Sequence, residues 1–241
     1  MKQGERIKYF AVDQHEDVLE IVIYGDITSW EWLDSDVSSY TLSKLITETD
    51  AAHIRIRINS YGGEVAEGLA IYNALKNHKA EITTVCDGFA CSAASVVFMA
   101  GDTRLMNPAS LLMIHNAWSS ASGNAKELRK KAGDLELISQ TMSSIYKAAI
   151  NITEEELETM LDNETWISPE DAVSKGFATG IIEPQDNTAK QQYAARRTVM
   201  SRVLAVSAES APQGEKPEQV GSKTPFQRLF DKFNFTGGEE G

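Results

Sequence analysis

Short segments in which apolar and polar residues alternate, or in which apolar residues run together, recur along the first half of the chain. Such segments are typical of β-strands, because successive side chains of a strand point to opposite faces. Four segments predict strands in this way: VLEIVIYG (18–25), IRIRIN (54–59), ITTVCD (82–87) and LLMIH (111–115). Helical patterns lie between them, and this order predicts an α/β fold with right-handed crossovers.

Helical spacing of apolar residues predicts three helices. Residues 64–77 carry apolar side chains largely on one face, which predicts an amphipathic helix. The residues after Ser92 are apolar on nearly all sides, as expected for a helix buried in a core. Residues 124–150 predict a long helix whose apolar seam needs a partner, either in the same chain or in another subunit: Leu135, Ile138, Met142, Ile145 and Ala149.

The segment IRIRIN has an unusual pattern for a parallel strand. Three isoleucines share one face, while Arg55 and Arg57 share the other. A parallel strand that is covered on both faces is apolar throughout. We therefore expect the arginine face to meet solvent or acidic partners.

The composition of the chain changes after about residue 185. Residues 185–224 are rich in Ala, Ser, Glu, Gly and Pro, which predicts a flexible polar linker after a folded domain over residues 1–184. Residues 225–241 predict a short amphipathic helix and the terminus, because Thr224–Pro225 is a plausible helix start. Its apolar stripe either docks onto a partner or folds back onto the body: Phe226, Leu229, Phe230 and Phe233.

Length and charge limit the functions that the chain can have. Its 241 residues, 42% of them hydrophobic, suffice for one sizeable core. The net charge of -12 argues against nucleic-acid binding, because an acidic surface repels phosphates. The sequence shows no secretory-signal pattern and no apolar run of the ~20 residues that a membrane span needs. We therefore expect a cytoplasmic protein without membrane contact.

The cysteines and the missing motifs argue against bound metals and cofactors. Cys86 and Cys91 lie in an apolar segment, which suggests buried free thiols in a reducing compartment. Because no Cys/His pair lies nearby, we expect no metal site. A Gly-x-x-x-x-Gly-Lys phosphate loop is absent as well. We expect no cofactor.

Two turns between a strand and a helix carry residues suited to chemistry. In INSYGGE (58–64), Gly62 and Gly63 permit positive φ and close approach of a ligand, and amides at a helix start stabilise an anion. A plain turn is the alternative. Ser92, in GFACSAASVVFMAG (88–101), occupies the equivalent place after the next strand. Its small neighbours allow close approach of a substrate backbone or close helix packing.

A nucleophilic serine needs a base within hydrogen-bonding reach and a third group that orients the base. Of the four histidines, His115 closes the apolar segment LLMIH, where a base can face a cleft. The alternative is a histidine that only caps a strand edge. No Gly-x-Ser-x-Gly motif surrounds Ser92, which argues against an α/β-hydrolase.

Carboxylates for the third position concentrate in MLDNETWISPEDA (160–172). Glu170 and Asp171 begin a helix, where acidic residues favour the helix dipole, so a structural role suffices for them. Asp162 and Glu164 remain as candidates for the acid.

Together these segments resemble the proteolytic subunit of the Clp protease, within the crotonase-like superfamily. INSYGGEVAEGLAIYNAL is similar to that family's Asn-Ser-Pro-Gly-Gly stretch and the helix after it. GFACSAASVVFMAG is similar to its Gly-x-Ala-Ala-Ser-Met-Gly-Ala segment, and LLMIHNAW to its Met-Ile-His-Gln-Pro segment. ETWISPEDAVSKGFATGII resembles the stretch near its end, so that the resemblance spans roughly residues 18 to 183.

The resemblance implies a fold of repeated β-β-α units with a protruding long helix and a flexible C-terminal tail. It also implies a serine endopeptidase with Ser92 as the nucleophile and His115 as the base. In the register set by Trp166, the family's catalytic aspartate falls on Glu164, with Asp162 as the alternative acid.

The resemblance further implies that the amides of Gly63 and Ala93 bind the oxyanion. This sequence departs from the family at three nearby positions. Tyr61 stands where the family has proline, and Ala93 and Ala94 stand where it has Met-Gly. The Ala93 amide can still serve, because every residue except proline supplies an amide donor.

The implied partners are protein substrates and further copies of the chain. Members of this family form stacked rings, which makes the helix at 124–150 the expected contact between rings. The ETW form and the polar tail look most like the phage head-maturation (prohead protease) branch, whose substrates are scaffold and capsid proteins. The alternatives are a housekeeping Clp peptidase that works with an unfolding ATPase, and a non-catalytic crotonase-like assembly module.

Overall fold

The computed structural model describes residues 12–15, 17–30 and 36–183. The predicted linker at 185–224 and the predicted docking helix at 225–241 lie outside the described residues. In the part of the chain that is described, no helix is both long enough and apolar enough to span a membrane.

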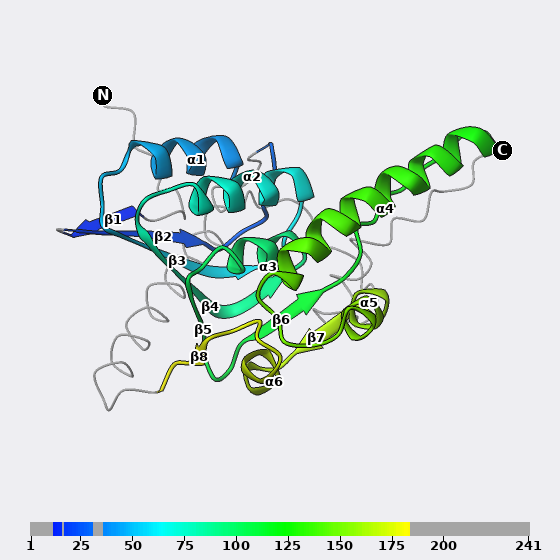
Figure 1. Ribbon diagram of the computed structural model, residues 1–241. Helices are drawn as coiled ribbons and strands as arrows, with labels where there is room; N and C mark the ends of the chain where they lie inside the picture. Colours follow the sequence, from blue (N-terminus) through cyan, green and yellow to red (C-terminus); the bar gives the residue numbers. More distant parts are fainter. Residues whose placement is uncertain (1–11, 16, 31–35, 184–241) are drawn as a thin grey trace, which may run out of the picture. The chain divides into compact units, whose positions relative to one another are not determined.

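The described residues form a sheet of eight strands, which is parallel except at β1 and β7 (Figure 1). The strands in chain order are β1 (Val12–His15), β2 (Val18–Ile23), β3 (His53–Ser60), β4 (Glu81–Cys91), β5 (Thr103–Met106), β6 (Leu111–Ile114), β7 (Thr165–Ile167) and β8 (Gly180–Ile181). Their order in the sheet is β1-β2-β3-β4-β5-β8, while β6 pairs with β4 and with β7.

Strand β4 divides the sheet. Its first half, Thr83 to Cys86, pairs with β5, and its second half, Phe89 to Cys91, pairs with β6. The strand therefore extends beyond the predicted range 82–87, because pairing with β6 keeps Gly88 to Cys91 extended up to Ser92. This division brings the ends of β4 and β6 side by side.

Six helices accompany the sheet in the described part of the chain: α1 (Ser39–Glu48), α2 (Val65–Lys76), α3 (Ala93–Phe98), α4 (Ala125–Lys147), α5 (Glu154–Asp162) and α6 (Pro169–Ser174). Helices α1, α2 and α3 cover one face of the sheet (Figure 1). All six residues of α3 are buried, as its apolar sequence predicted. The alternation of parallel strands and helices confirms the predicted α/β class.

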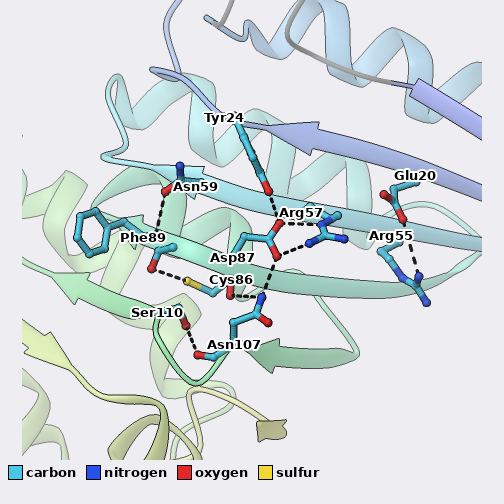
Figure 2. Close-up of polar contacts among 11 residues, drawn as sticks. Glu20, Tyr24, Arg55, Arg57, Asn59, Cys86, Asp87, Phe89, Asn107 and Ser110 are labelled. Carbon is cyan, nitrogen blue, oxygen red and sulfur yellow. Dashed lines mark hydrogen bonds and ion pairs between the residues drawn. The ribbon is translucent and has the colours of Figure 1, made fainter. Parts of the chain in front are cut away.

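The two faces of β3 differ as the IRIRIN pattern predicted. Ile54, Ile56 and Ile58 are fully buried beneath the helices. On the other face, Arg57 forms a two-pronged ion pair with Asp87, with Nε and Nη2 lying 2.7 and 2.6 Å from the carboxylate oxygens (Figure 2). Arg55 lies 3.8 Å from Glu20. The acidic partners that were expected for the arginine face thus lie within the same sheet.

Asp87 is the centre of this polar network. Besides Arg57, it accepts hydrogen bonds from the hydroxyl of Tyr24 and from Nδ2 of Asn107 at 2.8 Å (Figure 2). Burial would lower the pKa of Arg57, but the hydrogen bond and charge of Asp87 raise that pKa above its ordinary value. The guanidinium of Arg57 therefore remains charged.

Helix α4 begins with a capping box, in which Asn124 and Glu127 each accept a hydrogen bond from the other's amide. Its buried residues lie near its C-terminal end, whereas the N-terminal part extends away from the sheet (Figure 1). Three large apolar side chains of α4 are exposed by 36% or more: Leu128, Leu137 and Ile138. Of the predicted seam, Met142, Ile145 and Ala149 pack against the core of the described chain, whereas Ile138 is exposed.

Candidate active site

Ser92 occupies the turn between β4 and α3 with an unusual backbone conformation. Its φ of 53° and ψ of -124° lie in a region that residues other than glycine avoid. Within the described residues, Glu164 is the other non-glycine residue with positive φ. Such conformations cost on the order of 1–3 kcal/mol and cluster at functional sites.

The backbone of Ser92 is held on both sides, whereas its hydroxyl does not cap the helix. Its amide donates to the carbonyl of Met113 in β6 at 2.9 Å, and its carbonyl accepts from the amides of Ser95 and Val96. The side chain forms no capping hydrogen bond with α3. The hydroxyl is therefore free to point at the end of the neighbouring strand.

His115 follows β6 directly and meets this hydroxyl. Its Nε2 lies 2.7 Å from Oγ of Ser92. Burial lowers the pKa of His115 below its ordinary value of 6.5, although the negative charge of Glu164 acts in the opposite direction. The imidazole is consequently neutral at neutral pH, which is the state in which it can accept a proton.

The two candidate acids are placed differently. Asp162 ends α5, and its Oδ1 accepts a hydrogen bond of 2.7 Å from Nδ2 of Asn116. Glu164 follows two residues later, and its charge acts on His115. Neither carboxylate, nor any other among the described residues, lies within hydrogen-bonding or ion-pairing distance of the His115 ring. The structure thus joins the serine to the histidine, and links Glu164 to that pair through its charge alone.

The Gly62–Gly63 turn lies against the Ser92 turn. With φ of 98° and 141°, both glycines adopt conformations that disfavour other residues. A Cβ atom on Gly62 would lie 2.5 Å from the carbonyl oxygen of Cys91, and one on Gly63 would lie 2.1 Å from that of Ile27. Only glycine fits at either position.

Two amides at this junction have no acceptor among the described residues. Within the described part of the chain, neither the Gly63 nor the Ala93 amide donates a hydrogen bond, although the carbonyl of Gly62 and the amide of Glu64 both bond to Ile27. Unoccupied amides beside a nucleophile are suited to an oxygen that gains negative charge.

The Glu64 side chain holds the Gly62–Gly63 turn in place, a role that the sequence gave no reason to assign. Its Oε1 accepts hydrogen bonds from the Thr28 hydroxyl and from the amide and hydroxyl of Ser29. Burial would raise the pKa of Glu64, but these hydrogen bonds lower it below its ordinary value. The partners lie 35 or 36 residues away, so no local pattern reveals them.

A groove of about 620 Å³ lies between α4 and α5. Its lining includes Asn116 and Ala117, which follow His115 in the chain, and several carboxylates, among them Glu136, Glu158 and Asp162. The described residues contain no group of three or more metal-ligating side chains that could hold a metal ion.

A serine presented at a strand–helix turn to a histidine on the neighbouring strand, beside two unoccupied amides, is the arrangement of a serine hydrolase. The Clp protease family matches residues 14–185 of the chain, and the chain belongs to this family of serine peptidases. The predicted family is thereby confirmed.

Individual relatives agree with this assignment. The chain is 32% identical over 165 residues to the ATP-dependent Clp protease proteolytic subunit of Deinococcus radiodurans. These residues make up 68% of this chain and 80% of that protein. It is also similar to the solved structure of a ClpP1 mutant from Listeria monocytogenes, with a TM-score of 0.59 and 25% identity. That likeness covers 69% of this chain and 92% of the other.

Proposed function

We propose that the chain is a serine endopeptidase in which Ser92 attacks the carbonyl carbon of a peptide bond. His115 takes the hydroxyl proton and later gives it to the leaving amine. The observation that carries this proposal is the 2.7 Å distance between Nε2 of His115 and Oγ of Ser92, across 23 residues of sequence. The lowered pKa of His115 supports it, because a base must be unprotonated before it acts.

The amides of Gly63 and Ala93 bind the oxyanion of the tetrahedral intermediate in this proposal. Their lack of an acceptor in the described structure supports the assignment. Each such donor is worth on the order of 3 kcal/mol to the transition state.

Glu164 is the proposed third member of the triad. Burial lowers the pKa of His115 overall, but the negative charge of Glu164 acts to raise it. This is the electrostatic effect expected of an orienting carboxylate. The Glu164 side chain must still move to reach the ring, and catalytic hydrogen bonds often tighten only when substrate binds. Asp162 is the weaker candidate because Asn116 already occupies its carboxylate.

A fluorophosphonate probe tests the proposed nucleophile. The wild-type protein should be labelled at Ser92, and the Ser92→Ala variant should not. His115→Ala should be labelled far more slowly. Absence of label on a folded, assembled wild-type protein would contradict the peptidase proposal and would favour the non-catalytic assembly module.

Protein substrates and assembly into rings follow from the family in this proposal. The exposed apolar side chains of α4 support a contact with another copy, because large apolar groups on a projecting helix gain free energy when they are covered. Active sites enclosed by such rings select substrates by access rather than by side-chain recognition.

For the biological role, we infer the maturation of phage heads by cleavage of scaffold or capsid proteins. Support comes from the ETW form of the segment around Glu164 and from the polar tail that follows the peptidase domain. Deletion of residues 186–241 should abolish binding to a capsid or scaffold protein while Ser92 labelling persists.

The Deinococcus radiodurans relative favours a second role, that of a housekeeping peptidase subunit that depends on an unfolding ATPase. This role predicts that a folded protein is degraded only when such an ATPase and ATP are added. The maturation role predicts cleavage of scaffold protein without ATP. The same purified protein distinguishes the two.

A further inference from the structure

A buried chain of hydroxyl groups reaches the backbone of Ser92 from helix α4. The Tyr146 hydroxyl lies 2.7 Å from Oγ of Ser95, and this Oγ lies 2.6 Å from the carbonyl oxygen of Ser92. Tyr146 is fully buried, and Ser95 is 1% exposed. The sequence predicts none of this, because 51 residues separate the two hydroxyls.

The direction of the two hydrogen bonds follows from proton counting. A carbonyl oxygen only accepts, so Ser95 must donate its single hydroxyl proton to Ser92. Ser95 then has no proton left, and Tyr146 must be the donor to Oγ of Ser95. Burial raises the pKa of Tyr146 well above its ordinary value, so the phenol keeps the proton that this arrangement requires.

The receiving carbonyl belongs to a residue with a strained backbone. Ser92 has a φ of 53°, a conformation that persists only where surrounding contacts outweigh its cost. The amides of Ser95 and Val96 also bond to this carbonyl, but both belong to the same short helix. Tyr146 adds support from a separate element.

We propose that Tyr146 and Ser95 are positioning residues, which fix the Ser92 peptide so that Oγ meets His115 and the Ala93 amide faces the oxyanion. The proposal rests on the proposed function, because it assumes that Ser92 is the nucleophile. The position of α4 then affects the backbone conformation of Ser92, because Tyr146 of α4 supplies the donor.

Single hydroxyl deletions test the proposal. Tyr146→Phe keeps the ring and its packing against Phe177, whose centroid lies 5.9 Å away. Thr84→Val is the matched control, because the Thr84 hydroxyl is equally buried and donates to the carbonyl of Phe98, at the other end of α3, at 2.7 Å. Both variants lose one buried hydrogen bond to α3, but only one of these bonds leads to Ser92.

The readouts are the rate of fluorophosphonate labelling, kcat and KM for a peptide substrate, and hydrogen exchange of the peptide spanning residues 88–98. Tyr146→Phe should lower the labelling rate and kcat by about five- to tenfold, with KM unchanged, as expected when one buried hydrogen bond is lost. It should also speed amide exchange in residues 88–98. Thr84→Val should lower the melting temperature and leave the labelling rate unchanged.

The Ser95→Ala variant and the double variant show whether the hydroxyls act in series. If they do, adding Tyr146→Phe to Ser95→Ala should cause no further loss. Labelling of Tyr146→Phe at the wild-type rate would overturn the proposal, as would equal losses in Tyr146→Phe and Thr84→Val.

The failure of this proposal is distinguishable from failure of the proposed function. If the wild-type protein is never labelled, the peptidase proposal fails, and hydrogen exchange still reports whether Tyr146 holds the Ser92 backbone. Unchanged exchange in Tyr146→Phe would then reject the positioning role as well.

Discussion

A Cβ atom on Gly62 would lie 2.9 Å from the Cβ atom of Ser92. Two turns that are 30 residues apart in sequence therefore touch backbone to backbone at the candidate nucleophile. The contact leaves no room for a side chain, since Cys91 and Ala93 close the same space. Gly62 is thus the residue that allows the two turns to lie this close.

Replacement of Gly62 by alanine should destabilise the protein and slow the labelling of Ser92. The φ of 98° strains any other residue, and the added methyl meets backbone atoms that cannot move independently. We expect a loss of about 2 kcal/mol or more in the free energy of unfolding. Chemical denaturation and fluorophosphonate labelling measure the two effects.

Gly133 offers the control for that substitution. It lies within α4, where a Cβ atom would have no atom within 4 Å. Gly133→Ala should stabilise the protein by about 0.5–1 kcal/mol, because alanine is the better helix former. Equal changes in the free energy of unfolding for Gly62→Ala and Gly133→Ala would show that the close contact at Gly62 does not contribute to stability.

His115→Ala should abolish peptide cleavage while the fold persists. Nε2 of the ring is hydrogen-bonded to the Ser92 hydroxyl, so loss of the ring removes the proton acceptor. We expect kcat to fall by about four orders of magnitude or more. Circular dichroism checks the fold, and a variant that cleaves normally would remove the base assignment.

The pH profile separates the two candidate acids. Burial places the pKa of His115 below 6.5, so the acid limb of the rate should lie below that pH. The charge of Glu164 raises this pKa, and Glu164→Gln should therefore move the limb to a still lower pH while it also lowers the maximal rate. Asp162→Asn should leave the limb in place, because Asp162 binds Asn116 instead. A shift in Asp162→Asn alone would reverse the assignment.

The arginines of β3 should differ sharply in their contribution to stability. The Arg57 side chain is 24% exposed and pairs with an Asp87 side chain that is 9% exposed. Arg57→Leu leaves that carboxylate without its cationic partner, with only the hydrogen bonds from Tyr24 and Asn107, and should cost about 2–4 kcal/mol of unfolding free energy. Arg55→Leu removes a long ion pair whose arginine side chain is 52% exposed, and it should change stability by no more than about 0.5 kcal/mol. Urea unfolding of both variants compares them, and similar losses would contradict the burial argument.

A charge on the exposed face of α4 should disrupt assembly without unfolding the chain. Leu137 is 64% exposed, and Leu137→Glu would bury a carboxylate wherever another copy covers this face. Sedimentation velocity should show smaller particles for this variant. Val173→Glu on α6 is the control, since it changes a 37% exposed apolar residue on a different helix. Intact assembly of Leu137→Glu would remove α4 from the contact.

Much of the local structure was readable from the sequence. The alternation in IRIRIN predicted the buried isoleucines, and the apolar run after Ser92 predicted the buried helix α3. These features depend on residues that are close in sequence, since periodicity reports which face is covered. Helix α5 was not predicted, although Thr153 followed by three glutamates is a readable helix start.

The sequence by itself determined that positive φ is available at Gly62 and Gly63 and that Ser92 lies at a strand–helix turn, because these are local properties. It did not indicate the positive φ of Ser92 and Glu164. Only the tertiary structure decided which polar groups meet. It brought His115 to Ser92, gave Asp162 to Asn116 and placed Tyr146 behind Ser95. The physical reason is that the pattern of apolar and polar residues indicates which side chains are buried, but not which groups they contact. The partner of a buried hydroxyl or carboxylate is fixed by how distant elements cross.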